Sequence, residues 1–336
     1  MVYFITHETI KKTNIIYMNR REFTKAAVAA MLSTVALRTS FGAVKVSDIA
    51  ESTSPFKSKF APHFGLLKTT LKGMPLTDQL QFFYDCGFRA LEDNGMMKRP
   101  VEVQKEIAKK MEQLGMEMGV FCAHTEWKLP SFTGNKVMGE KNRLKKDPKA
   151  VRESLVAAMK EAVEVGKRVN AKWCTVVPGL EDPSLSPEFQ FANVVENLKY
   201  MSDVCAKSGL IMVLEPLNIL NHPSLYLKRV PQAYAICKAV NSPYCKILDD
   251  LYHQQITEGN LIPNFDAARS EIAYVQVGDV PGRNEPTTGE INYKNVFQHL
   301  WDSGYRGIIG MEHRQSDNSS EGDKKLLKAY RSVDVA

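Results

Sequence analysis

Short apolar runs alternate with amphipathic segments along most of the chain. The runs are four to nine residues long and often β-branched, which is typical of buried strands, and the segments between them have apolar residues at helical spacing. The predicted strands cover residues 59–67, 88–93, 116–124, 172–179, 211–215, 246–250, 272–279 and 307–313. Eight strand–helix pairs predict an α/β protein with a single closed (β/α)8 TIM barrel. An open flavodoxin-like sheet would need only about five pairs.

One connection departs from this regular alternation of strands and helices. Residues 125–147 form a polar, lysine-rich stretch after the third predicted strand. It is too long for an ordinary strand–helix connection, so we expect a lid or part of a substrate pocket.

The first 43 residues read as a targeting segment, and residues 44–336 as the barrel domain. Arg20 and Arg21 are followed by Phe23 and then by the mild apolar run AAVAAMLSTVAL. This order resembles a twin-arginine export signal and predicts a periplasmic protein. The run is too short to cross a bilayer comfortably, so no membrane span is expected. Met18 is a second candidate for the start of translation.

Charge and cysteine content narrow the classes of partner. The leader carries six basic and two acidic residues, so the rest of the chain is near +2 of the total +6. Charge therefore gives no argument for a nucleic-acid partner. The six cysteines lie in apolar patterns without a CxxC pair, which favours buried thiols over a disulfide framework. The sequence does not set the oligomeric state and is compatible with a homo-oligomer.

The candidate chemistry lies where the last four predicted strands end. Glu215, Asp249 or Asp250, Gln276 and Glu312 each follow or close an apolar run. In a barrel, the carboxyl ends of the strands meet at one rim, so these side chains should converge. Crowded carboxylates repel one another unless a cation binds between them. Ligation by oxygen alone predicts a divalent metal, Mg, Mn or Ca rather than zinc, with Mg or Mn favoured.

Other polar residues surround this set in the sequence. His253 lies one helical turn beyond Asp250, and the Arg283 guanidinium is suited to a substrate carboxylate or hydroxyls. We also expect His124 and Glu92 to contact the substrate. The remaining candidates for the rim are His63, Trp127 and Glu290.

Two glutamates beside a metal-bound α-hydroxycarbonyl imply isomerisation or epimerisation. The metal would acidify the C–H bond and stabilise the enediolate oxygens, while one glutamate removes the proton and the other returns it. No cofactor other than the metal is required. There is no GxGxxG or GxxxxGK[ST] motif to suggest a nucleotide.

Four segments carry a family resemblance: LEPLN at 214–218, DDLYHQQITEGNLIPN at 249–264, YVQVGDVPGRNEPTTGEINY at 274–293 and GYRGIIGMEH at 304–313. They resemble the hydroxypyruvate isomerase family, within the xylose isomerase-like barrels of the sugar phosphate isomerases and epimerases. The resemblance implies Glu215, Asp250, Gln276 and Glu312 as metal ligands. It also implies Glu215 and Glu312 as the acid/base pair, and His253 and Arg283 as substrate-binding residues.

The substrate stays open at this point. The family's name implies interconversion of hydroxypyruvate and tartronate semialdehyde. The stretch HTEWKLPSFTGN departs from the asparagine- and proline-rich loop expected of the family after strand three. Together with the export signal, this leaves a sugar or keto-sugar epimerase, or a keto-glycoside lyase or keto-inositol dehydratase, as alternatives. A non-enzymatic carbohydrate- or metal-binding barrel is the third hypothesis.

Overall fold

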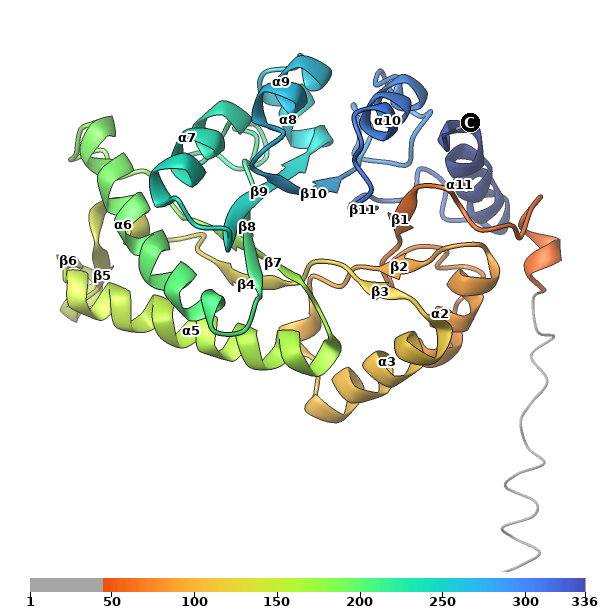
Figure 1. The fold of residues 1–336 in the computed structure, drawn as a ribbon, viewed down its shortest axis with the longest axis horizontal. Coiled ribbons are helices and arrows are strands. Elements are labelled where there is room, and N and C mark those ends of the chain that lie inside the picture. The colour runs from red at the N-terminus through yellow and green to blue at the C-terminus, as the bar shows by residue number, and fades with distance from the viewer. Residues whose placement is uncertain (1–44, 336) are drawn as a thin grey trace, which may run out of the picture. The chain divides into compact units, whose positions relative to one another are not determined.

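The computed structural model describes residues 45–335, which belong to one compact unit (Figure 1). The predicted leader lies outside the described residues and stays a prediction. Within residues 45–335, no helix has both the length and the apolar character needed to cross a membrane. All six cysteines are free, and five of them are buried, as their apolar surroundings predict.

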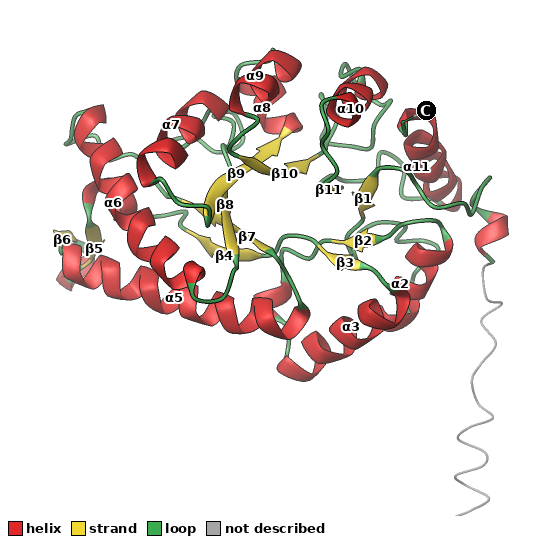
Figure 2. Ribbon diagram, viewed as in Figure 1, coloured by secondary structure: helices red, strands yellow, loops and turns green. Residues whose placement is uncertain are grey.

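Parallel strands form a ring with helices outside it (Figure 2). The ring strands are β1 (Lys59–Ala61), β2 (Ala90–Leu91), β3 (Glu117–Met118), β4 (Cys122–Thr125), β7 (Trp173–Val177), β8 (Ile211–Leu214), β9 (Cys245–Asp250), β10 (Ile272–Gln276) and β11 (Ile308–Gly310). Seven of them pair in the order β1-β11-β10-β9-β8-β7-β4. The parallel pair β2-β3 lies between β4 and β1. The backbone N–H of Glu92 donates to the Pro62 carbonyl at 3.1 Å and so links the ends of β2 and β1.

The third predicted strand is two short strands instead of one. β3 pairs with β2, whereas β4 pairs with β7. The break falls after Gly119, where a Cβ atom would collide with the hydroxyl of Tyr274 reaching across the barrel. Glycine is needed at such a close approach, and it weakens the strand locally.

The outer layer follows the predicted helices closely. Its helices are α2 (Leu76–Asp85), α3 (Val101–Leu114), α5 (Pro148–Val169), α6 (Pro187–Ala206), α7 (Val230–Val240), α8 (Leu251–Thr257), α9 (Leu261–Ala268), α10 (Tyr293–Asp302) and α11 (Ser320–Val333). In α5, Leu155, Met159 and Val163 are spaced four apart and face the core. The short helix α8 was not predicted, and it begins directly after Asp250.

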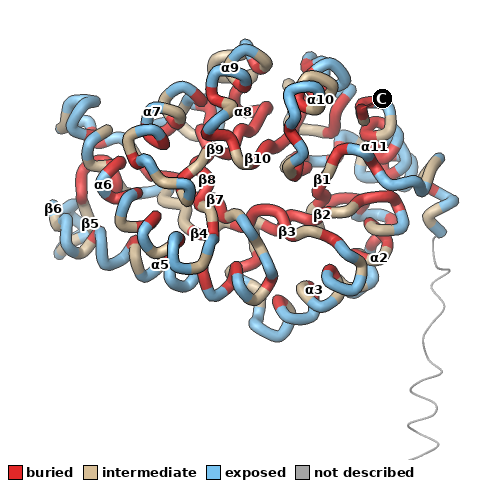
Figure 3. The backbone as a smooth tube through the Cα atoms, in the orientation of Figure 1, coloured by how far each residue is buried: buried red, intermediate tan, exposed pale blue. Residues whose placement is uncertain are grey.

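Two apolar layers hold the barrel together. Aliphatic side chains and one tyrosine fill the interior: Ala61, Ala90, Val120, Val213, Leu248, Tyr274 and Ile308. A larger cluster packs the outward faces of the strands against the helices. Figure 3 shows most residues of the ring strands buried, while the helices expose their outer faces.

The lysine-rich stretch 125–147 packs on the outer helices. It contains α4 (Ser131–Gly134) and an antiparallel pair, β5 (Lys136–Met138) with β6 (Leu144–Lys146). Asn193 and Asn197 of α6 donate to the Thr133 and Phe132 carbonyls at 2.6 and 3.1 Å. Helix α4 thus packs on α6 and β5 lies against α5, so the expectation of a lid was wrong for this part (Figure 1).

Strand alternation separates the two aspartates that end β9. The Asp250 side chain points toward the end of the barrel where the strands terminate. The Asp249 side chain points to the other face of the sheet. Asp249 is fully buried, and neither of its carboxylate oxygens has a hydrogen-bond partner among residues 45–335. Burial, reinforced by the charge of Asp250, raises the pKa of Asp249 to about 8. The structure thus places Asp250, not Asp249, with the other candidate ligands.

This raised pKa predicts a pH dependence of stability. Between about pH 4 and pH 8 the native Asp249 holds a proton that the unfolded chain has released. The free energy of unfolding should therefore fall as the pH rises through this window. Asp249→Asn should reduce that fall by about 2 kcal/mol or more between pH 5 and pH 8, as measured by chemical denaturation. Asp203→Asn, at an exposed position on α6, is the control, and an equal fall in wild type and Asp249→Asn would contradict the prediction.

Candidate active site at the barrel mouth

The four predicted strand-end residues lie at one end of the barrel, which we call the barrel mouth. Glu215 follows β8, Asp250 closes β9, Gln276 closes β10 and Glu312 comes two residues after β11. Gln276 pairs in register with Asp250 on one side and with Gly310 on the other. Glu215, Asp250 and Gln276 are buried, whereas 28% of the Glu312 side chain is exposed. Glu312 is thus the most accessible of the four to a substrate.

Arg283 joins two of these carboxylates. Its Nη2 donates to Asp250 Oδ2 at 2.7 Å and to Glu312 Oε2 at 2.9 Å, and its Nε donates to the Glu312 carbonyl at 2.9 Å. Although burial opposes the charged form, Asp250 and Glu312 raise the pKa of Arg283. Arg283 is therefore positively charged and is the direct counterion of both carboxylates.

The loop after β10 holds Arg283 in this place. The buried Asp279 carboxylate accepts hydrogen bonds from the backbone N–H groups of Val280, Gly289 and Ile291. The backbone N–H of Arg283 donates to the Asp279 carbonyl at 2.9 Å, and Arg283 itself has a φ of +52°. One buried carboxylate thus fixes both ends of the segment that bears the guanidinium.

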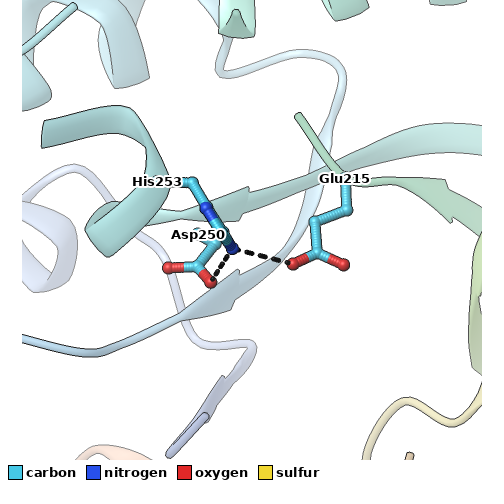
Figure 4. A group of neighbouring side chains, drawn as sticks. All are labelled: Glu215, Asp250 and His253. Atoms are coloured by element: carbon cyan, nitrogen blue, oxygen red, sulfur yellow. Dashed lines mark ion pairs between the residues drawn. The ribbon is translucent and has the colours of Figure 1, made fainter. Parts of the chain in front are cut away.

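Glu215, Asp250 and His253 form a compact group (Figure 4). Their nearest ligand atoms all lie within 4.8 Å of one another. His253 Nε2 lies 3.5 Å from Asp250 Oδ2 and 3.8 Å from Glu215 Oε1. Helix α8 brings the imidazole there, since Asp250 caps that helix by accepting from the Tyr252 N–H at 2.9 Å.

The hydrogen bonds of His253 indicate which nitrogen bears its proton. The backbone N–H of Asn218 donates to Nδ1 at 3.2 Å, so Nδ1 is an acceptor. Burial lowers the pKa of His253 to about 3, which leaves the ring neutral with its hydrogen on Nε2. That N–H points to the carboxylates and has no hydrogen-bond partner among the described residues. A protonated Nε2 donates and does not ligate a metal, so the geometry favours substrate binding as the role of His253.

Gln276 is held by a further carboxylate. Its Nε2 lies 3.4 and 3.3 Å from the two carboxylate oxygens of Glu92, which also accepts from the Tyr274 hydroxyl at 3.1 Å. Gln276 Oε1 is buried and has no partner within residues 45–335. Glu92 therefore belongs to the same polar network as the predicted ligands, in addition to lining the cleft beside Glu312.

Concentrated negative charge governs the electrostatics of the barrel mouth. Burial, followed by the charge of Glu312, raises the pKa of both Glu92 and Glu215. Burial raises the pKa of Glu312 to about 7, although Arg283 opposes the shift. These directions have one cause: carboxylates taken out of water near one another disfavour their charged forms.

This donor set fits a divalent cation. Glu215, Asp250, Gln276 and Glu312 present carboxylate and amide oxygens, and the unpartnered Gln276 Oε1 is a ligand atom that no protein group satisfies. A cation among these oxygens would relieve the repulsion between the carboxylates. The assignment of individual ligands stays a prediction.

The remaining predicted residues lie at different depths. His63 faces a cleft of about 440 Å³ lined also by Glu92, Asn94 and Glu312, and its Nε2 lies 3.1 Å from the His313 carbonyl oxygen. His124, at the end of β4, has a buried Nε2 with no partner among the described residues. Glu290 is exposed and accepts from Gln255 at 3.1 Å.

An aromatic row borders the other side of His253. The exposed Trp127 ring stacks on His222 with centroids 5.4 Å apart, and His222 lies 5.5 Å from the His253 ring. Trp127 was therefore a sound candidate for the rim, whereas His222 was not predicted.

Three residues that orient the predicted site residues were not identified from the sequence. Asn94 donates to Glu312 Oε1 at 2.8 Å, Asn218 holds His253, and Tyr274 holds Glu92. Asn218 lies within the segment LEPLN, and Asn94 directly follows the predicted strand 88–93. Their targets are more than thirty residues away, and no local pattern reveals such contacts.

Comparison with known proteins places the chain in a family. The model of the xylose isomerase-like TIM barrel family matches residues 80–333. Hydroxypyruvate isomerase of Escherichia coli (strain K12) is 30% identical, with coverage of 73% of this chain and 90% of that protein. A putative hydroxypyruvate isomerase of Homo sapiens is 35% identical over 54% of this chain and 66% of the human protein, just under two thirds. The 2-oxo-tetronate isomerase of Cupriavidus necator is 35% identical over 39% of this chain and half of that protein.

Solved structures agree on the fold. An AP endonuclease of family 2 from Brucella melitensis superposes with a TM-score of 0.63 at 23% identity, over 79% of this chain and 96% of that one. The 3-keto-D-glucoside 4-epimerase YcjR from E. coli gives a TM-score of 0.63 at 18% identity, over 82% of this chain and all of that one. The match over residues 80–333, the ring of parallel strands and the polar barrel mouth lead to one conclusion: the chain belongs to the xylose isomerase-like TIM barrel family.

Proposed function

We propose that this protein is a metal-dependent isomerase that interconverts hydroxypyruvate and tartronate semialdehyde, as an intramolecular oxidoreductase of the aldose–ketose type. The observation that carries the proposal is the convergence of three carboxylates at the barrel mouth, where Asp250 lies beside Glu215 and His253 and Arg283 joins Asp250 to Glu312. The isomerase names of the relatives support the reaction class.

Under this proposal, Glu215, Asp250, Gln276 and Glu312 hold a divalent ion, Mg or Mn. When bound, such an ion polarises a carbonyl and stabilises negative charge on the neighbouring oxygens. The chain supplies the rest of the chemistry through its own side chains. The His253 Nε2–H and the Arg283 guanidinium donate to substrate oxygens and orient the hydroxy-keto group.

The two glutamates carry the proton between adjacent carbons. One carboxylate removes a proton from the hydroxymethyl carbon of hydroxypyruvate. The other carboxyl returns a proton to the former carbonyl carbon, while the hydroxyl proton passes from one substrate oxygen to the other. Atoms and electrons balance without a redox partner.

A second candidate substrate is a keto-sugar or keto-glycoside. The exposed Trp127 ring, stacked on His222 beside His253, offers a flat apolar face of the kind that binds the C–H face of a sugar ring. The predicted export signal would favour such a substrate as well, and we propose a periplasmic location on the sequence alone. The reaction would then be an epimerisation, or an elimination as in a keto-glycoside lyase or keto-inositol dehydratase.

Glu312→Gln tests the acid/base pair. The amide keeps the shape of the side chain but cannot accept the proton, so kcat on hydroxypyruvate should fall at least about 100-fold. The circular dichroism spectrum should not change. Glu153→Gln, on the exposed face of α5, should keep wild-type turnover. Retention of full activity in Glu312→Gln would remove the glutamate pair from the mechanism.

Metal binding can be tested without turnover. Addition of Mn²⁺ or Mg²⁺ to chelator-treated protein should raise the thermal unfolding midpoint, because a ligand bound at 100 times its Kd stabilises the fold by about 2.7 kcal/mol. Asp250→Asn should lose most of that increase, while Asp203→Asn should keep it. An equal increase in all three proteins would show that the ion binds elsewhere.

The two substrate classes separate by product analysis. Wild-type protein and Trp127→Ala should be incubated with hydroxypyruvate and with a 3-keto-glucoside, and the products identified by NMR. A hydroxypyruvate isomerase should convert the keto acid equally well in both proteins. A keto-sugar enzyme should convert the 3-keto-glucoside instead, and Trp127→Ala should raise its KM about tenfold by loss of the stacking surface.

A further inference from the structure

Glu92 has no assigned part in the proposed reaction, yet it is among the most buried charged residues of the described chain, with only 1% of its surface exposed. It follows β2, on the side of the barrel away from β8. Its carboxylate accepts from Tyr274 at 3.1 Å and faces the Gln276 amide at 3.3 and 3.4 Å. A carboxylate buried at this cost calls for a reason.

The contact with Gln276 decides which end of an amide faces the proposed cation. A side-chain amide has one oxygen and one nitrogen of nearly equal size, and only the oxygen can ligate a metal. An ionised carboxylate only accepts hydrogen bonds, so Gln276 turns its Nε2 to Glu92 when Glu92 is ionised. Its Oε1 then faces the other way, buried and without a partner among residues 45–335.

The surrounding strands are shaped to keep Glu92 in this position. A Cβ atom at Gly310, the residue paired in register with Gln276, would collide with the Glu92 carboxylate. A Cβ atom at Gly119 would collide with the Tyr274 hydroxyl that holds the carboxylate from the other side. Glycine at 119 and 310 thus leaves the space that the Glu92 carboxylate and the Tyr274 hydroxyl occupy.

We propose that Glu92 is a positioning residue that orients the Gln276 amide so that Oε1 faces the divalent cation. The inference rests on the proposed function, since it requires the metal site. Glu92 acts through Gln276 and need not contact the ion or the substrate. Carboxylates that hydrogen-bond a metal ligand in this way commonly contribute 10- to 100-fold to metal affinity.

A double-mutant cycle with metal affinity as its readout tests this role. Mn²⁺ would be titrated by calorimetry into chelator-treated wild type, Glu92→Ala, Glu92→Gln, Gln276→Ala and the double variant Glu92→Ala/Gln276→Ala. Glu92→Ala should weaken Mn²⁺ binding by about 10- to 100-fold. In the Gln276→Ala background the same substitution should cost less than about twofold, because the amide to be oriented is gone.

Glu92→Gln separates orientation from charge. Its side-chain oxygen can still accept from Gln276 Nε2, so affinity should stay within about threefold of wild type. Glu92→Gln also keeps the proposal testable if Glu92→Ala fails to fold. Thermal unfolding of the metal-free protein would reveal such a failure. Binding by Glu92→Gln as weak as by Glu92→Ala would mean that Glu92 acts as a charge.

Two further results would overturn the proposal. In the first, Glu92→Ala would weaken Mn²⁺ binding as much in the Gln276→Ala background as in wild type. This would mean that Glu92 contacts the ion itself. Wild-type affinity in Glu92→Ala would remove any role for Glu92 while the metal site stands. Failure of the folded wild type to bind Mn²⁺ would be distinct from both, because it would refute the metal site of the proposed function and this inference with it.

Discussion

Mutual repulsion of buried carboxylates is the constraint on which the barrel mouth depends. Glu92, Glu215, Asp250 and Glu312 act on one another's charge inside the barrel, and Arg283 pairs directly with two of them. One guanidinium cannot balance four carboxylates. Burial, reinforced by the neighbouring carboxylates, raises the pKa of Glu92, Glu215 and Glu312. A structure that stores this repulsion at one point is organised for a positively charged ligand.

The barrel provides the rigidity that such an arrangement requires. Each charged residue follows a short strand whose neighbours fix its register, and fixed partners then hold the side chain. Asn94 holds Glu312, Asn218 holds His253, and Asp279 holds the loop that bears Arg283. Because these partners come from different strands and loops, the charged groups cannot separate without opening the barrel.

The sequence allowed the fold and the main site residues to be predicted, since both depend on local pattern. Apolar runs that end in a carboxylate or amide located Glu215, Gln276 and Glu312 and left Asp249 and Asp250 as alternatives, and the (β/α)8 order followed from the count of units. Local signals also mark the start of α5, where Asp147 caps and Pro148 begins the helix.

The contacts between segments far apart in the chain could not be predicted from the sequence. The break between β3 and β4 depends on a tyrosine hydroxyl reaching Gly119 from the far side of the barrel. The part of the stretch 125–147 that forms α4 and the β5-β6 hairpin was misjudged, because polar composition does not distinguish a lid from a segment that packs on outer helices. The tautomer of His253 depends on the backbone N–H of Asn218, thirty-five residues away. In each case a single long-range contact sets the outcome, and no periodicity carries that information.

The double engagement of Arg283 bears on the order of events in the proposed reaction. Its Nη2 is already shared between Asp250 and Glu312 and its Nε donates to the Glu312 carbonyl, so two of its three guanidinium nitrogens are engaged by these residues. If those carboxylates turn to a divalent ion, the guanidinium loses its strongest partners and becomes free to bind substrate. Metal and substrate would then favour each other's binding, and the coupling must be reciprocal. A site that releases its arginine only on metal loading would bind the keto acid weakly until the ion that activates it is present.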